Sequence, residues 1–307
     1  MPQPLTPLQK ALAGAFFFFF GVGVVGSFYL FLTAPKPIDP RIAMPELVGR
    51  YPQIKSLLVQ KAENEIYAQN PDESLDMGPM SGFMETLTLL QLRDAGKLSL
   101  DQPIEGFAMT VEQAMRQAFI PIDADRQANT TDHLSSLASQ ALRAQIQLLG
   151  AYPGLVEETV LQPLEMQHTH YLPEQQTWQT TPRDLMRLIY VLNFNTKKGI
   201  YDRKHPFHYK TLIEATSLAN REKLQDWGLA VYLDDRYGLD RLSWVCVSEG
   251  RCLIVRRFPG RWFHYVIDFE GSERDAKDFA RQMEDIYIGF EVPYRQRQQA
   301  LNAERQP

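Results

Sequence analysis

Cysteine is scarce in this chain of 307 residues, which contains only Cys246 and Cys252. With five residues between them, the two cysteines exclude a multi-cysteine zinc site built from cysteine ligands alone. In an oxidising compartment they could form a disulfide that closes a small hairpin. The alternative is a pair of buried free thiols, and the sequence does not choose between the two.

The chain also lacks an excess of basic residues. It has 32 Lys and Arg against 37 Asp and Glu, a net charge of −5 and an isoelectric point near 5.7. A surface that binds phosphates is usually basic, so this balance argues against nucleic acid as a partner. Charged residues make up 22% and hydrophobic residues 44% of the chain, which is typical of a globular domain and not of a disordered one.

Metal-binding and cofactor-binding motifs are missing as well. The close histidine pairs are His168 with His170 and His205 with His208. Neither pair has HEXXH-like spacing, and the chain contains no EF-hand ligand pattern. We therefore expect neither a metal site nor a cofactor.

A long uncharged segment lies near the N-terminus. Residues 11–34 contain no charged side chain. As an α-helix, the segment would span a hydrocarbon core of roughly 30 Å. A signal peptide usually has a shorter apolar run and a small-residue cleavage site, whereas Pro35 and Pro37 follow this run directly. The segment is predicted to be an uncleaved transmembrane anchor. The remaining parts are then a short tail (1–10), a proline-rich stalk (35–50), one folded domain (51–292) and a polar tail (293–307).

Predicted strands lie at both ends of the domain and enclose a helical block. Residues 54–62 and 65–70 read as a hairpin that turns at Glu63–Asn64. Three C-terminal segments (241–249, 252–258 and 262–270) are rich in β-branched and aromatic residues, and an amphipathic helix (272–290) follows them. Residues 233–240 read as an acidic loop. The order predicts an α+β fold in which the hairpin and the three C-terminal strands form one antiparallel sheet, flanked by helices and a helical lobe.

Several helix ends can be located from capping residues. Thr110 and Gln113 form a capping box, and Gly96 is suited to end the preceding helix in a left-handed conformation. Thr181 before Pro182, and Ser272 before the last helix, are typical N-caps. The helix between residues 82 and 97 is apolar on almost every side, which predicts that it is buried.

Three segments resemble the superfamily of serine β-lactamases and penicillin-binding DD-peptidases. LLQLRDAGKLSLDQPI (89–104) is similar to the end of the helix that carries the nucleophile in that family, and MTVEQAMRQAF (109–119) resembles the start of the helix that leads to its second motif. PLEMQHTHY (163–171), followed by TTPRDLMRLIYVL (180–192), resembles its "LGM…T" segment and the next helix. The resemblance implies a β-lactamase-like fold and an extracytoplasmic location.

Catalysis in that family needs the motifs S-x-x-K, S-D-N or Y-x-N, and K-[ST]-G. The lysine, one helical turn after the serine, activates the hydroxyl as a general base. In one register of this chain Ser81 takes the serine position and Met84 the lysine position; in another, Pro79 and Gly82 do. A thioether cannot accept a proton at neutral pH. Ser81 is then a vestigial nucleophile or simply a helix N-cap, and Glu85 shares its helix face as an unconventional candidate base.

The second and third motifs are degenerate too. Ile122, Asp123 and Ala124 fall at the S-D-N positions, where only the aspartate is retained. No lysine occurs between Lys223 and Lys277, the interval in which the K-[ST]-G strand should lie. That strand is assigned to Ser248, Glu249 and Gly250, and Arg241 or Arg251 is a candidate replacement for the cation.

The sequence therefore predicts a degenerate member of the family that is attached to the membrane, with its domain in the periplasm or otherwise outside the cytoplasm. We expect it to be inactive and to bind an envelope protein or a peptidoglycan-derived ligand. The alternatives are an active hydrolase that uses Ser81 and a structural subunit of a membrane complex. The vestigial catalytic candidates are Ser81 and Asp123, and the candidates for the ligand cleft are Met84, Ile122, Ala124, Ser248, Glu249 and Gly250.

Overall fold

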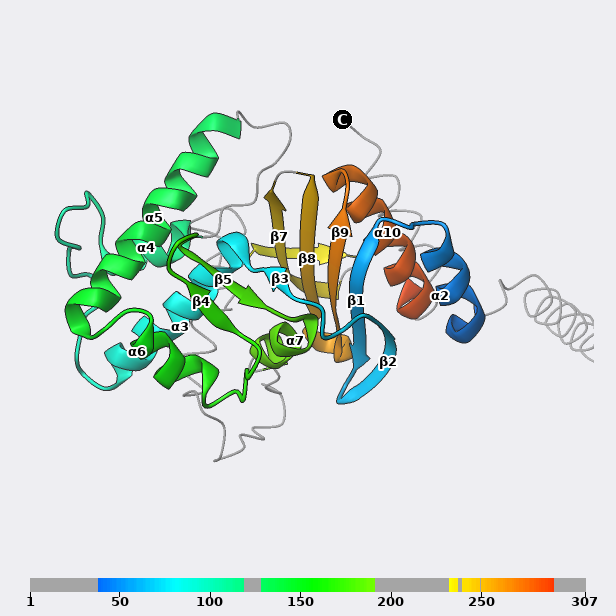
Figure 1. The fold of residues 1–307 in the computed structure, drawn as a ribbon, viewed down its shortest axis with the longest axis horizontal. Helices are drawn as coiled ribbons and strands as arrows, with labels where there is room; N and C mark the ends of the chain where they lie inside the picture. Colours follow the sequence, from blue (N-terminus) through cyan, green and yellow to red (C-terminus); the bar gives the residue numbers. More distant parts are fainter. Residues whose placement is uncertain (1–37, 119–127, 191–231, 237–238, 249, 290–307) are drawn as a thin grey trace, which may run out of the picture. The chain divides into compact units, whose positions relative to one another are not determined.

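A six-stranded antiparallel sheet is the centre of the fold (Figure 1), with the strand order β2-β1-β9-β8-β7-β6. Its strands are β1 (Ile54–Lys61), β2 (Asn64–Gln69), β6 (Tyr232–Arg236), β7 (Leu239–Ser248), β8 (Arg251–Phe258) and β9 (Phe263–Glu270). The pairing of β1 with β9 confirms that the first and last strands of the domain meet in one sheet. The first hairpin turns at residues 62–63, one position earlier than expected.

The computed structural model describes residues 38–118, 128–190, 232–236, 239–248 and 250–289. Contacts divide the chain into residues 1–39 and residues 40–307. The second unit contains the sheet and the following helices: α2 (Pro40–Gly49), α3 (Ser81–Asp94), α4 (Val111–Gln117), α5 (Ala128–Leu149), α6 (Gly154–Val156), α7 (Pro182–Tyr190) and α10 (Glu273–Tyr287). Short 3₁₀ or π turns occupy Gly78–Met80 (η1), Glu157–Leu161 (η2) and Pro259–Arg261 (η4).

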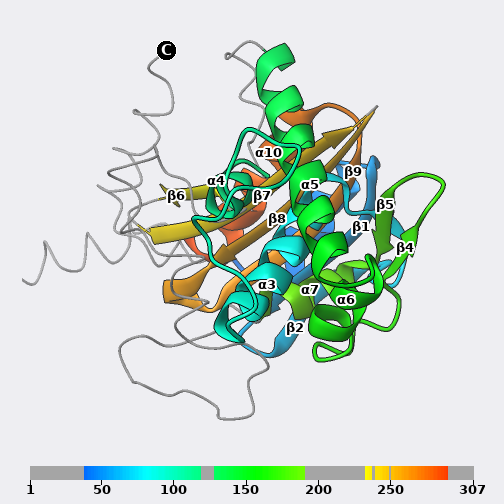
Figure 2. The same ribbon diagram turned by 90° about the vertical axis from the view of Figure 1, so that its left-hand side faces the viewer.

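The two faces of the sheet pack against different helices. Successive side chains of a strand point to opposite faces, so Leu253 and Val255 of β8 join one core while Cys252 and Ile254 join the other. The first core includes α3, α4 and α5, and the second includes α2 and α10. Figures 1 and 2 show the same division, with α3 and α5 on one side of the sheet and α2 and α10 on the other.

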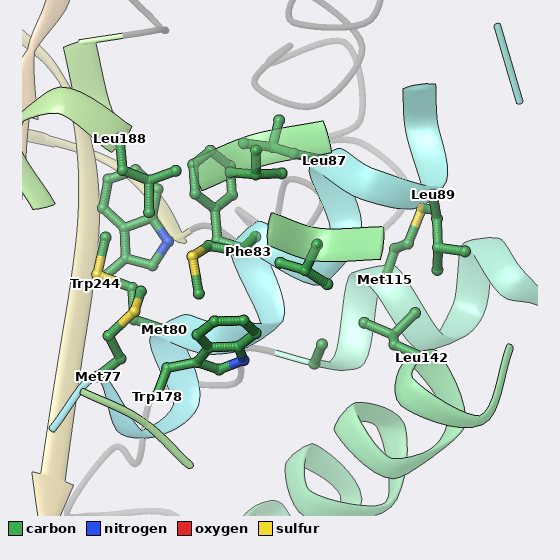
Figure 3. Close-up of a cluster of buried hydrophobic side chains, with 14 of the residues drawn as sticks. Met77, Met80, Phe83, Leu87, Leu89, Met115, Leu142, Trp178, Leu188 and Trp244 are labelled. Carbon is green, nitrogen blue, oxygen red and sulfur yellow. The ribbon is translucent and has the colours of Figure 1, made fainter. Parts of the chain in front are cut away.

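Helix α3 lies in the middle of the first core, as its apolar pattern predicted. Its residues from Ser81 to Leu90 are all buried. Phe83 packs against Trp244 of β7, with ring centroids 5.1 Å apart (Figure 3). The predicted caps are confirmed. Gly96 has a φ of +71° after the helix, and Thr110 and Gln113 form the capping box of α4.

A second, three-stranded sheet lies beside this core in the order β3-β5-β4. Its strands are β3 (Leu75–Asp76), β4 (His170–Leu172) and β5 (Thr177–Thr180). The sequence did not predict it, because strands of two to four residues are too short to show an alternating pattern.

The acidic segment 233–240 is not the loop that the sequence suggested. Most of it belongs to β6 and β7, which pair from Tyr232 with Ser243 to Arg236 with Leu239. Acidic residues are uncommon in central strands, but β6 is an edge strand, where charged residues are frequent.

The predicted stalk is also wrong over most of its length. Residues 40–49 form helix α2, and Met44 and Leu47 are fully buried in the core shared with α10. Pro45 lies only in the sixth position of this short helix, where it removes one backbone donor without ending the helix. The folded domain therefore begins at Pro40 and not at residue 51.

The proposed disulfide is contradicted by the geometry of the sheet. Cys246 pairs with Leu253, and Cys252 pairs with Val247 on the neighbouring strand. The two cysteines therefore point to opposite faces, one in each core, and both are buried free thiols.

The predicted anchor (11–34), the N-terminal tail and the polar tail lie outside the described residues. In the part of the chain that the structure describes, no helix has the length and the hydropathy needed to cross a membrane.

Replacing Leu47 tests whether α2 is part of the folded domain. Leu47→Ala removes a fully buried side chain, so we expect the free energy of unfolding to fall by about 2–4 kcal/mol. Glu46→Ala changes an exposed neighbour on the same helix and should alter stability by less than about 0.5 kcal/mol. Chemical denaturation measures both, and equal stabilities for the two variants would restore the stalk model.

Thiol reactivity tests the location of the cysteines. Burial raises the pKa of Cys246 well above its ordinary range and that of Cys252 to about 12. Neither thiol should react with a disulfide reagent at pH 8 until the protein is unfolded, because the thiolate is the reactive form. Fast labelling of the native protein, or an intact mass two hydrogens lighter under oxidising conditions, would show that this arrangement is wrong.

Candidate functional site

Ser81 is the first residue of helix α3 and follows the turn η1. Its side chain is 1% exposed. It is not the N-cap that the sequence suggested, since Met80 holds that position and makes no side-chain capping bond. The Ser81 hydroxyl instead accepts a hydrogen bond from Nη2 of Arg143 at 3.4 Å. The residue in the nucleophile position is thus in contact with a cation from helix α5.

Arg143 connects Ser81 to a carboxylate buried on the same helix. Its Nε donates to Oε1 of Glu85 at 2.8 Å, and its Nη1 donates to the backbone carbonyl of Gln176 at 2.9 Å. Glu85 is completely buried and lies four residues after Ser81. One guanidinium therefore links two positions of α3 to the turn between β4 and β5.

Two aromatic side chains complete the hydrogen-bond network around Glu85. The Tyr152 hydroxyl donates to Oε1 of Glu85 at 3.0 Å and accepts from Nε1 of Trp178 at 2.9 Å. Tyr171 packs against both rings, with centroid distances of 5.1 Å to Tyr152 and 5.3 Å to Trp178. These contacts place an aromatic cluster next to the ion pair.

Burial controls the electrostatics of this network. Desolvation raises the pKa of Glu85, and Arg143 and Tyr152 only partly oppose that effect. Desolvation and the nearby carboxylate also raise the pKa of Tyr152, so the phenol remains protonated. Burial alone would lower the pKa of Arg143, but the Glu85 charge and its hydrogen bond, with Tyr152, outweigh that effect and raise the pKa, so Arg143 remains a cation. Oε2 of Glu85 is buried and has no hydrogen-bond partner in the structure.

Neither register of the first motif provides a lysine, and the structure shows what surrounds each position. Met84 is fully buried in the first core. Gly82, at the lysine position of the other register, packs against α4: a Cβ atom there would lie 3.0 Å from Cβ of Ala118. A lysine side chain at Gly82 would therefore require α3 and α4 to separate.

Two of the residues assigned to the third motif, Ser248 and Gly250, lie where β7 ends and β8 begins. Ser248 ends β7 and pairs with Arg251, and Gly250 has a φ of +67°. Both candidate cations are already paired with buried carboxylates: Arg251 with Asp268, and Arg241 with Glu284 at 3.5 Å. Each of the two arginines is therefore held by a carboxylate of the protein itself.

The remaining candidates are only partly covered by the structure. Ile122, Asp123, Ala124 and Glu249 lie outside the described residues, as do His205 and His208. His168 donates its backbone N–H to Asp184, and His170 is exposed on β4. No cluster of three or more metal-ligating side chains occurs in the described ranges.

Sequence reasoning identified Ser81 and Glu85 but missed Arg143, Tyr152 and Trp178. Arg143 is 58 residues from Glu85 in sequence and belongs to no motif of the resembled family. No local signal in the sequence distinguishes it from an ordinary polar residue of a long helix. Only the packing of α5 against α3 brings the two charges together.

The chain is similar to known proteins in its fold, but it matches no known sequence family. No protein-family model matches the chain. No curated protein matches it either. Solved structures do match the chain. The three described next are 12–14% identical to it in sequence, so the likeness concerns the fold alone.

Three of these structures are penicillin-binding or β-lactamase proteins. The octameric penicillin-binding protein homologue from Pyrococcus abyssi matches over 81% of this chain and 76% of its own, with a TM-score of 0.61 and 12% identity. A penicillin-binding protein from Bacillus halodurans matches over 80% and 99%, with a TM-score of 0.59 and 14% identity. A β-lactamase/D-alanine carboxypeptidase from Yersinia pestis matches over 80% and 98%, with a TM-score of 0.57 and 12% identity. The chain therefore has the fold of the penicillin-binding-protein and serine β-lactamase superfamily.

Breaking the ion pair tests its role in the fold. Arg143→Met leaves the Glu85 charge buried without its cation, so we expect a loss of about 3–5 kcal/mol at pH 7. Because a buried carboxyl with a raised pKa binds more protons in the folded than in the unfolded state, folding stability falls as pH rises through that pKa. The loss should therefore be smaller at pH 5, where more of the Glu85 carboxyl is protonated.

Two control variants isolate the buried charge as the cause. Adding Glu85→Gln to Arg143→Met should recover much of the lost stability, because no charge then remains uncompensated. Arg183→Met breaks the exposed pairs with Glu65 and Asp72 and should cost only about 0–1 kcal/mol. Denaturation at both pH values measures all the variants. A pH-independent loss in Arg143→Met, or no recovery in the double variant, would contradict this account of Glu85.

Proposed function

We propose that this chain is a membrane-anchored, penicillin-binding-protein-like protein of the cell envelope that acts by binding and not by serine–lysine acyl transfer. The observation that carries the proposal is Met84. It occupies the lysine position relative to Ser81 and is completely buried in the core. The side chain in contact with the Ser81 hydroxyl is instead the guanidinium of Arg143.

The chemistry of that contact argues against acyl transfer. A serine needs a neighbouring base to accept its proton. Arginine remains protonated in proteins and only donates hydrogen bonds, so Arg143 holds the hydroxyl oxygen without removing its proton. A lysine at Gly82 is opposed by the close approach of Ala118. The arrangement therefore favours binding over catalysis.

The ligand is proposed by analogy with proteins of the same fold. Two of the structural neighbours are named for binding penicillin or for a relation to such proteins, and one is named as a D-alanine carboxypeptidase. A peptidoglycan-derived peptide is therefore the proposed small ligand, and an envelope protein is the proposed macromolecular partner. The uncharged segment 11–34 supports attachment to a membrane, with the domain outside the cytoplasm.

One observation favours a second candidate, an active hydrolase that uses Ser81. Oε2 of Glu85 has no hydrogen-bond partner among the described residues, and burial raises the pKa of this carboxyl. A carboxylate with a raised pKa is a stronger base. Arg143 donates to both Glu85 and Ser81, so the candidate base and the candidate nucleophile lie next to the same guanidinium.

Covalent labelling distinguishes the two candidates. The full-length protein in mild detergent is incubated with a fluorescent penicillin and, separately, with a fluorophosphonate, and adducts are detected by intact mass. An active carboxypeptidase serves as the positive control, and a cooperative thermal transition shows that the protein is folded. We expect no adduct with either reagent, because among the described residues the side chain that contacts the Ser81 hydroxyl is a cation and not a base.

An adduct would overturn the proposal if it disappeared in Ser81→Ala. Glu85→Gln then identifies the base. Loss of labelling in this variant, with the fold retained, would establish Glu85 in that role. Unchanged labelling would point to a group outside the described residues.

A further inference from the structure

We infer that Arg143 is an autoinhibitory cover on Ser81: its guanidinium closes the way to the hydroxyl and swings aside, with Glu85 as its pivot, when a ligand enters. The inference concerns the regulation of the proposed site and rests on the proposed function only for the presence of a ligand. Three observations carry it: the burial of Ser81, the partial exposure of Arg143, and the unequal contacts that Arg143 makes.

Ser81 is closed off from solvent although it begins a helix. The first turn of a helix leaves backbone N–H groups without intrahelical partners, and water or a ligand often satisfies them. The Ser81 side chain is nevertheless 1% exposed, and the neighbouring Met80 and Gly82 are buried as well. A side chain that covers the hydroxyl must therefore move before a ligand contacts it.

Arg143 is in the position of such a cover. Among the described residues, it provides the side chain that hydrogen-bonds to the Ser81 hydroxyl. The Arg143 side chain is 23% exposed, whereas that of Glu85 is fully buried. One side chain thus contacts both solvent and the buried hydroxyl. Partly exposed side chains change rotamer on a fast timescale without any change of the backbone, so a cover of this kind opens while the fold is retained.

The contacts of Arg143 indicate which part of its side chain is fixed. Nε donates to the buried carboxylate of Glu85 at 2.8 Å, which is a charge-assisted bond. Nη1 donates at 2.9 Å to the carbonyl of Gln176, in the turn between β4 and β5. Nη2 meets the Ser81 hydroxyl at 3.4 Å, longer than the usual range of a hydrogen bond. The contact with Ser81 is therefore the first to break, and the pair with Glu85 is the pivot.

Electrostatics also weakens the contact at Ser81. The N-terminus of an α-helix carries a partial positive charge, so a cation beside it is unfavourable. Arg143 lies next to the first residue of α3, and Glu85 on the same helix supplies the compensating charge. A hydrogen-bond acceptor of a ligand suits this helix end better than a cation does. The cover is thus a closed state that a ligand displaces.

Cysteine accessibility tests the cover without any ligand. Ser81→Cys and, as a buried control on the same helix, Thr88→Cys are introduced into the full-length protein in mild detergent and labelled with iodoacetamide. Thr88 is fully buried, and its hydroxyl contacts Thr159 and not Arg143. Each variant is combined with Arg143→Ala plus Glu85→Gln, which removes the cover without leaving a buried charge. The native cysteines are buried and give the background rate.

Removing the guanidinium should speed labelling at position 81 at least about tenfold and leave position 88 protected, because the reaction needs access to the thiol. The effect of charge has the opposite sign. A neighbouring cation lowers the pKa of a thiol and favours the reactive thiolate, so the loss of Arg143 by itself slows the reaction. A faster rate therefore reports access and not a change in pKa.

Three outcomes would overturn the cover: fast labelling at position 81 with Arg143 in place, equally slow labelling with and without Arg143, or labelling at positions 81 and 88 together. Where the combined variant loses its cooperative thermal transition, Arg143→Lys decides, since lysine keeps a cation for Glu85 but has no second nitrogen for Ser81. Faster labelling at position 81 in this variant supports the cover, and an unchanged rate overturns it. The penicillin and fluorophosphonate adducts report on the proposed function separately.

Discussion

A buried carboxylate determines how the helical side of this domain is assembled. Glu85 is on α3, a helix enclosed on nearly every side, and an isolated charge there would cost several kcal/mol. Arg143 supplies the compensating cation from α5, Tyr152 donates from the chain that follows α5, and the same guanidinium binds the backbone of the β4–β5 turn. One charge on α3 thus connects to α5, to the chain that follows α5 and, through Arg143, to the β4–β5 turn.

The same interaction accounts for the chemical character of the site. In the resembled family the first turn of this helix carries a serine and a neutralisable lysine, which exchange a proton. Here the two registers offer an apolar thioether and a glycine packed against a neighbouring helix. The cation beside Ser81 comes from another helix, and its charge is held by Glu85. A cation fixed in this way stabilises the fold but cannot serve as a base.

Local rules predicted the parts of the structure that depend on local interactions. The caps at Gly96 and Thr110 follow from backbone geometry and neighbouring side chains. The pairing of the first and last strands followed from their hydrophobic pattern and the family resemblance. The Glu85–Arg143 pair depends on residues 58 positions apart, and no short motif encodes such a contact. The disulfide failed for a related reason, because spacing alone does not reveal to which face of a sheet each cysteine points.

The segment that was predicted to be a stalk shows how the N-terminal boundary of the domain is set. Four prolines between residues 35 and 50 suggested an extended connection, but Met44 and Leu47 lie three residues apart and form one turn-spaced apolar stripe that fits α10. The buried side of this helix instead fixes residues 40–49 to the domain. The packing that moves the domain boundary to Pro40 therefore makes this helix a part of the folded unit.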